Sequence, residues 1–308
     1  MLTVAGISPS LDLTYLVDSL QLGEIQRSST VVSCAGGKPL NAARAAAALG
    51  AEVAVVAILG GPTGELIDRA LDTAGITTVT VPTPNPTRTC VSIAAADSGR
   101  LTEVYQNAAE VPGPVWDRFS HEVAALLLDR PGWLLVNGGA PLGLDAAAIA
   151  GLVGLAHHRG VRVAVDTYGA SLEQAVQVRP ALVKVNRAEA SALLGADGEA
   201  DLLELAAELQ RRTGELVVLT DGRDGAVAVD DRHRLRVHLP DRVGRYPVGS
   251  GDSFLAGLVT ALDRGDDLPT ALTWAAAAGT ANALVPGPGV FSRGDVTELA
   301  GQIRVTAP

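Results

Sequence analysis

The chain has 308 residues, of which 47% are hydrophobic, and its 24 Lys and Arg residues against 34 Asp and Glu residues give a net charge of −10. This length and composition allow a large buried core, and an acidic chain without a basic run argues against nucleic acid or an anionic membrane as partner. The two cysteines, Cys34 and Cys90, lack the spacing of a zinc site or a disulfide framework. The chain opens without a signal peptide and has no apolar run that could cross a bilayer, so we expect a soluble, cytoplasmic protein.

Short apolar runs alternate with segments of helical period along most of the chain. Runs that are apolar on both faces indicate buried parallel strands, and the alternation predicts a doubly wound α/β domain spanning residues 1–308. The helix from Leu40 has the clearest ends, with Pro39 at a favoured first position and Gly50 just beyond. We expect strands at 52–59, 133–136, 161–165, 182–185 and 216–219, and helices at 40–49, 64–74, 145–158, 187–194 and 201–212.

Two stretches, about 11–32 and 88–106, alternate without a helical period. The second contains a turn at Asp97-Ser98-Gly99 and predicts a hairpin. We expect the two stretches to form a small β lid, whose edge could pair between subunits in a homodimer. A further hairpin, 226–229 against 235–239, is expected at the edge of the main sheet.

The segment Gly249-Ser250-Gly251-Asp252 precedes an apolar helix. Flexible backbone and the positive end of the helix dipole favour an anion there, and a carboxylate beside an anion site is unexpected unless it acts as a base. The structural alternative is an ordinary turn with Asp252 as a helix cap.

A second glycine turn, Gly36-Gly37-Lys38, begins the helix that carries Asn41. The glycines permit close approach of a ligand, Asn41 can bind hydroxyls, and Lys38 can neutralise a phosphate. Taken alone, this too could be a plain strand-to-helix turn with a solvated lysine.

Together and in this order, the two glycine turns resemble the ribokinase/PfkB family of carbohydrate kinases, and the resemblance covers essentially the whole chain. It implies a ribokinase-like three-layer α/β/α sheet with a small β lid. Asp12 to Tyr15, Gly23-Glu24 and Thr87-Arg88-Thr89 are most similar to the branch that phosphorylates phosphohexoses, such as 1-phosphofructokinase and tagatose-6-phosphate kinase. Further motifs in family order are Ser10-Leu11-Asp12, 184–189, 220–225 and 278–282.

The resemblance implies ATP as phosphoryl donor, Mg²⁺ as cofactor, and a role for each motif. Asp252 is the implied base, and the amides of Gly249, Ser250 and Gly251 are the implied anion hole. For the sugar, the resemblance implies Asp12 and Asn41 at hydroxyls, the turn Gly36-Gly37, and Arg27, Lys38 and Arg88 at a phosphate. For the nucleotide, it implies Lys184, Asn186, Thr220, Gly222 and Gly225 at the phosphates and ribose, and Val248, Ala276, Gly279 and Thr280 at the adenine.

Two of these assignments have structural alternatives. Asn186 and Glu189 are implied to organise Mg²⁺ through water, but the same spacing is typical of a capping box at a helix start. Asn282 either lines the adenine slot or is a buried asparagine bonded to backbone.

Departures from the family pattern bear mainly on the acceptor. Pro39 and Ser250 replace glycine and alanine, Val185 replaces proline, and 245–248 lacks the Asp-Thr-Thr run linked to a monovalent cation site. Gly139 stands where sugar-phosphate kinases usually have a serine, so a hydroxyl that would contact substrate is absent. The acceptors we expect are fructose 1-phosphate, fructose 6-phosphate and tagatose 6-phosphate.

Two other functions stay open. One is a ribokinase- or nucleoside-kinase-like enzyme with an unphosphorylated acceptor, and the other is a non-catalytic sensor of nucleotide or sugar phosphate. An oxidoreductase is disfavoured because no Gly-x-Gly-x-x-Gly follows the first strand.

Overall fold

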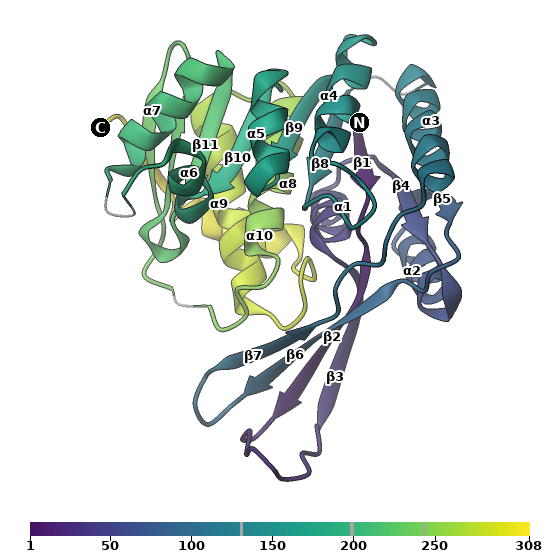
Figure 1. The fold of residues 1–308 in the computed structure, drawn as a ribbon. Helices are drawn as coiled ribbons and strands as arrows, with labels where there is room; N and C mark the ends of the chain where they lie inside the picture. The colour runs from purple at the N-terminus through teal and green to yellow at the C-terminus, as the bar shows by residue number, and fades with distance from the viewer. Residues whose placement is uncertain (130–131, 198–199, 243) are drawn as a thin grey trace.

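The main sheet crosses the whole molecule in a computed structural model that describes residues 1–129, 132–197, 200–242 and 244–308 (Figure 1). In the described residues its order is β14-β13-β12-β11-β10-β9-β8-β1-β4-β5, and the pairs from β11 to β5 are parallel. The strands are β1 (Leu2–Gly6), β4 (Val53–Leu59), β5 (Thr77–Pro82), β8 (Trp133–Asn137), β9 (Arg162–Asp166), β10 (Leu182–Asn186), β11 (Leu216–Thr220), β12 (Ala226–Val229), β13 (Arg234–His238) and β14 (Arg304–Thr306).

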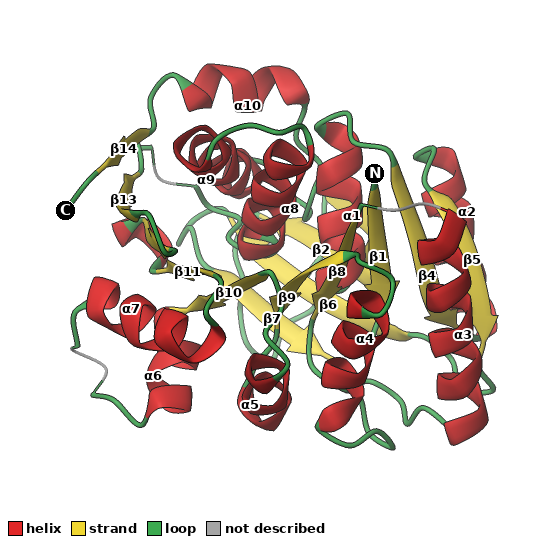
Figure 2. Ribbon diagram, turned by 90° about the horizontal axis from the view of Figure 1, so that it is seen from above, coloured by secondary structure: helices red, strands yellow, loops and turns green. Residues whose placement is uncertain are grey.

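Helices cover both faces of this sheet, which makes three layers (Figure 2). One face carries α1 (Lys38–Ala48), α2 (Gly61–Thr73), α8 (Ser250–Asp263), α9 (Leu268–Leu284) and α10 (Arg293–Ala300), and these helices share one apolar core with the sheet. The other face carries α3 (Gly113–Asp129), α4 (Ala147–His157), α5 (Gly169–Gln177), α6 (Arg187–Leu194) and α7 (Leu202–Thr213), over two further core clusters. The expected doubly wound α/β fold is confirmed.

A second sheet projects from the body (Figure 1). Its order is β3-β2-β6-β7, formed by β2 (Ser10–Val17), β3 (Thr30–Gly36), β6 (Arg88–Ala95) and β7 (Leu101–Tyr105). These strands come from the two stretches expected to form a lid. Asp12 pairs with Cys34 on β3 and Cys90 on β6, so the three side chains share one face. Closure of this sheet over a substrate stays a prediction.

The hairpin β12–β13 corrects one expectation. It joins the sheet beside β11, but it is not the edge, because β14 near the C-terminus pairs with β13. A strand of three residues with little apolar pattern gives almost no sequence signal. None of the helices in the described residues combines the length and apolar character needed to span a bilayer.

Candidate active site

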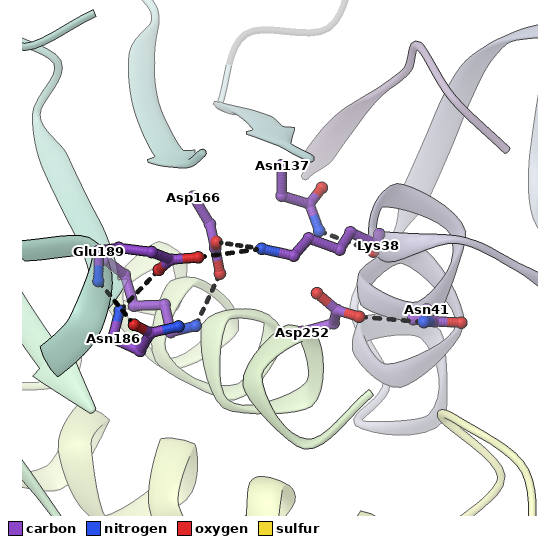
Figure 3. A network of polar contacts seen from close by, with 8 residues as sticks. Lys38, Asn41, Asn137, Asp166, Asn186, Glu189 and Asp252 are labelled. Carbon is purple, nitrogen blue, oxygen red and sulfur yellow. Dashed lines mark hydrogen bonds and ion pairs between the residues drawn. The ribbon is translucent and has the colours of Figure 1, made fainter. Parts of the chain in front are cut away.

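Asp252 lies in the first turn of α8 and is only 5% exposed. Its carboxylate accepts a hydrogen bond of 3.0 Å from the Asn41 side-chain amide in the first turn of α1 (Figure 3). The two glycine turns, more than two hundred residues apart in the chain, therefore open on the same place. Burial raises the pKa of Asp252 to about 6, and the nearby Asp166 carboxylate acts in the same direction.

The start of α8 supplies backbone donors beside this carboxylate. Gly249 adopts φ of +80°, and a Cβ there would meet Pro288 at 2.5 Å, so glycine is required. The Ser250 amide, however, donates to the Pro247 carbonyl at 3.0 Å. In this conformation Ser250 is therefore not a free donor, and the first-turn amides of Gly251 and Asp252 are better placed for an anion.

Asp166 is the functional residue that our sequence reading missed. It ends β9, is 1% exposed, and accepts from Lys38 at 2.9 Å and from Lys184 at 2.6 Å. Burial alone would raise its pKa, but the two ammonium groups outweigh burial and lower it. The sequence did contain a signal for Asp166, since this acid directly follows the strand expected at 161–165. The carboxyl ends of parallel strands are where α/β sheets bind ligands.

Lys38 and Lys184 place two cations at the same edge of the sheet. Burial disfavours the Lys38 ammonium, but Asp166 and Asp252 more than compensate and raise its pKa. A Cβ at Gly251 would lie 3.0 Å from the Lys184 ammonium nitrogen, so that cation sits directly against the start of α8. The cluster is therefore suited to hold phosphate oxygens in an otherwise acidic protein.

Asp12 meets the glycine turn of α1 from the second sheet. Its carboxylate accepts from Ser10 at 2.5 Å and from the Gly37 amide at 3.3 Å, and burial raises its pKa. A Cβ at Gly36 would lie 2.1 Å from the Asp12 carboxyl carbon. The Asp12 carboxylate therefore packs against the turn in its present position only because residue 36 is a glycine, and a side chain at 36 would have to push it aside.

The predicted magnesium pair forms a capping box at α6. The Asn186 side chain accepts from the Glu189 amide at 2.9 Å, and Glu189 accepts from the Asn186 amide at 2.8 Å. The other Glu189 oxygen lies 3.9 Å from the Lys38 ammonium nitrogen. Among the described residues no group of three or more His, Cys, Asp or Glu side chains could hold a metal by itself. The Glu189 oxygen outside the capping box could bind Mg²⁺ through water. This arrangement fits a Mg²⁺ ion held mainly by water and substrate phosphates, not one enclosed by protein ligands.

A cavity of about 560 Å³ opens between the start of α8, α9 and the end of β11. Its volume is in the range of small-molecule sites. Val248 is not among its lining residues, and its carbonyl instead accepts from Asn282 at 2.7 Å. The cavity is lined by seven of the residues expected near nucleotide or phosphate, namely Thr220, Gly222, Gly225, Gly251, Ala276, Gly279 and Thr280, together with Ser250.

Of the two alternatives for Asn282, the structure shows the buried asparagine bonded to backbone. It is 0% exposed and joins the loop before α8 to the loop after α9 through Val248, Ser250 and the Gly289 amide.

Arg88 and Arg27, which we expected to bind the phosphate of the acceptor, are less favourably placed for that role than Lys38. Three hydrogen bonds tie the Arg88 guanidinium to the carbonyls of Ser8, Pro9 and Gln106. Arg27 is exposed in the connection between β2 and β3, at the end of the second sheet opposite to Asp12. The structure therefore does not bring Arg27 to the cluster around Asp252.

Comparison with known proteins agrees with this geometry. The pfkB family carbohydrate kinase model matches residues 1–292. A tagatose-6-phosphate kinase from Staphylococcus epidermidis is 28% identical over 310 residues, covering 99% of both chains. The structure of Escherichia coli phosphofructokinase-2 in complex with substrates and products is similar with a TM-score of 0.90 and 25% identity, over 97% of this chain and 98% of that one. A Thermotoga maritima protein described as a possible 1-phosphofructokinase has a TM-score of 0.92 at 20% identity, over 100% and 99%.

The fold and the site thus define a phosphotransferase with an alcohol acceptor. The chain belongs to the pfkB family of carbohydrate kinases.

Proposed function

We propose that the protein transfers the γ-phosphoryl group of ATP to a primary hydroxyl of a phosphohexose, with fructose 1-phosphate, fructose 6-phosphate and tagatose 6-phosphate as the acceptors to test. The observation that carries the proposal is the buried Asp252, which has a pKa of about 6 and is fixed by Asn41 next to the start of α8. A carboxylate tuned toward neutral pH is suited to accept a hydroxyl proton. The similarity to a tagatose-6-phosphate kinase and to phosphofructokinase-2 supports a phosphorylated acceptor.

In the proposed reaction, a carboxylate oxygen of Asp252 takes the proton of the acceptor hydroxyl while the hydroxyl oxygen of the acceptor bonds to the γ-phosphorus. The bond from the γ-phosphorus to the bridging oxygen breaks, and ADP leaves with the electron pair. Lys184 and the first-turn amides of α8 stabilise charge on the transferring group, which is the main contribution of proteins to phosphoryl transfer. Mg²⁺, organised by Glu189 through water, would neutralise charge on the ATP phosphates.

The sugar would lie between the second sheet and α1. Asp12 and Asn41 would bind its hydroxyls, since both border the turn at Gly36 and Gly37. Arg88 and Lys38 remain proposed partners of the acceptor's own phosphate. A homodimer formed through the second sheet and a cytoplasmic location also stay predictions.

The test is ADP release by purified protein with MgATP and a panel of phosphohexoses, free hexoses, ribose and nucleosides. We expect turnover with at least one phosphohexose, and we expect Asp252→Asn to lower kcat by about 10²–10⁴-fold, the usual contribution of a general base. Asp266→Asn, at a half-buried acid just after α8 that pairs with Arg264, is the matched control and should keep wild-type rates.

Two results would replace the proposal. Turnover only of ribose or a nucleoside would indicate a kinase for an unphosphorylated acceptor. Equal ligand binding by wild type and Asp252→Asn, without ADP from either, would indicate a sensor.

A further inference from the structure

The loop after β8 lacks a hydroxyl side chain that we expected at the acceptor site. Residue 139 is a glycine and has no side chain, whereas the resemblance to sugar-phosphate kinases implies a serine here. The loop borders the site directly, because the Asn137 side chain at the end of β8 donates to the Lys38 carbonyl at 2.7 Å (Figure 3). The Gly138 amide donates to the Asp166 carbonyl at 2.8 Å.

Tyr168 occupies the space left by Gly139. A Cβ at Gly139 would lie 2.6 Å from the Tyr168 hydroxyl oxygen and 2.8 Å from the ring carbon that bears it. Gly139 does not have a positive φ, so its backbone would accept a side chain. A side chain at 139 would therefore have to push the Tyr168 ring aside, because the phenol hydroxyl lies beside the point from which it would project.

The Tyr168 side chain is also placed to meet an anion. Tyr168 precedes α5, two residues beyond Asp166, and the Lys38 ammonium nitrogen lies 5.8 Å from the centre of its ring, within reach of a cation–π contact. Tyr168 is 53% exposed. An exposed phenol donor next to a lysine at the mouth of a site can donate to an anion bound there.

We propose that Tyr168 is a specificity-determining residue for the acceptor: its phenol hydroxyl replaces the hydroxyl missing at 139 and, beside Lys38, donates to the phosphate that the acceptor already carries. This inference rests on the proposed phosphohexose kinase function and names a residue that recognises its acceptor. Tyr168 takes no part in proton transfer, so its contribution belongs to acceptor binding.

The first test is Tyr168→Phe, which removes only the hydroxyl. A hydrogen bond to a charged group is worth enough that we expect KM for the phosphohexose to rise about ten-fold or more, with kcat and KM for ATP within about two-fold of wild type. With the corresponding phosphate-free hexose as acceptor, Tyr168→Phe should match wild type. Tyr15→Phe is the control, because Tyr15 is three residues from Asp12 on β2 and therefore faces the other side of the second sheet.

The second test exploits the steric exclusion at Gly139. Gly139→Ser alone must displace the ring of Tyr168, so we expect KM for the phosphohexose to rise about ten-fold or more. Adding Tyr168→Ser frees the space and returns a hydroxyl to 139, so the double variant should recover most of the loss. Circular dichroism and Tm would establish that each variant is folded.

Different results would contradict the proposed kinase function and the proposed role of Tyr168. Wild-type protein that phosphorylates no phosphohexose contradicts the proposed function. Wild-type turnover with an unchanged phosphohexose KM in Tyr168→Phe, or a double variant no better than Gly139→Ser, overturns the role of Tyr168.

Discussion

At the scale of single residues, the environment of Asp252 predicts the pH range of the proposed reaction. Its pKa of about 6 belongs to the ligand-free protein, which is the form that governs kcat/KM. Because the base acts only when ionised, kcat/KM should fall about ten-fold per pH unit below about pH 6 and level off above it. The acceptor phosphate also titrates near pH 6, so the residual activity of Asp252→Asn is the reference. An acid limb that persists unchanged in this variant would belong to the substrate and contradict the assignment.

The same carboxylate should cost stability at neutral pH. Its folded pKa, about 6, lies above the ordinary value of 3.8 for an aspartate, so the folded state holds the proton more tightly than the unfolded state between these values. Wild-type stability therefore falls as pH rises through this window, and the loss is complete above about pH 6. We expect Asp252→Asn to raise the free energy of unfolding by about 2–3 kcal/mol at pH 8, with little gain at pH 4. Urea unfolding at both pH values measures this, and an equal effect at the two would refute it.

At the scale of elements, the contact between β2 and β3 links the second sheet to acceptor binding. Gly36 lies at the end of β3 without a positive φ, so Gly36→Ala is compatible with the strand but must push Asp12 aside. We expect KM for the acceptor to rise at least about ten-fold, while KM for ATP changes less than about two-fold. Gly151→Ala, in α4 with nothing near its Cβ position, is the control and should leave both constants unchanged. An unaltered acceptor KM in Gly36→Ala would remove Asp12 from the sugar site.

The elements also show what a sequence can and cannot predict here. The strands β4, β8, β9, β10 and β11 were predicted to within a residue or two at each end, because continuous apolar runs report burial on both faces. The proposed role of Asp252 came from the family resemblance that local motifs carry. Asp166 was missed because its meaning depends on Lys38 and Lys184, which only the fold brings to it. The exclusion of a side chain at Gly139 likewise depends on Tyr168, a contact between two loops that no spacing encodes.

At the scale of the whole molecule, the second sheet has two unlike faces. One carries Asp12 toward the site. Strand alternation puts Val31 and Val104 on the opposite face, where they are 48% and 62% exposed, and the β2–β3 connection adds Leu22 and Ile25 at 94% and 82%. Exposed apolar side chains gathered on one projecting element are typical of an interface.

We therefore predict that this sheet pairs with a second copy of the chain, and that wild-type protein is a dimer at micromolar concentration by light scattering. Leu22→Glu with Ile25→Glu should convert it to a monomer, because two buried charges without partners oppose association. Leu128→Glu is the matched control, since Leu128 is 69% exposed on α3, away from the second sheet, and should stay dimeric. A monomeric wild type, or a dimer that survives the double substitution and is lost in Leu128→Glu, would move the interface elsewhere.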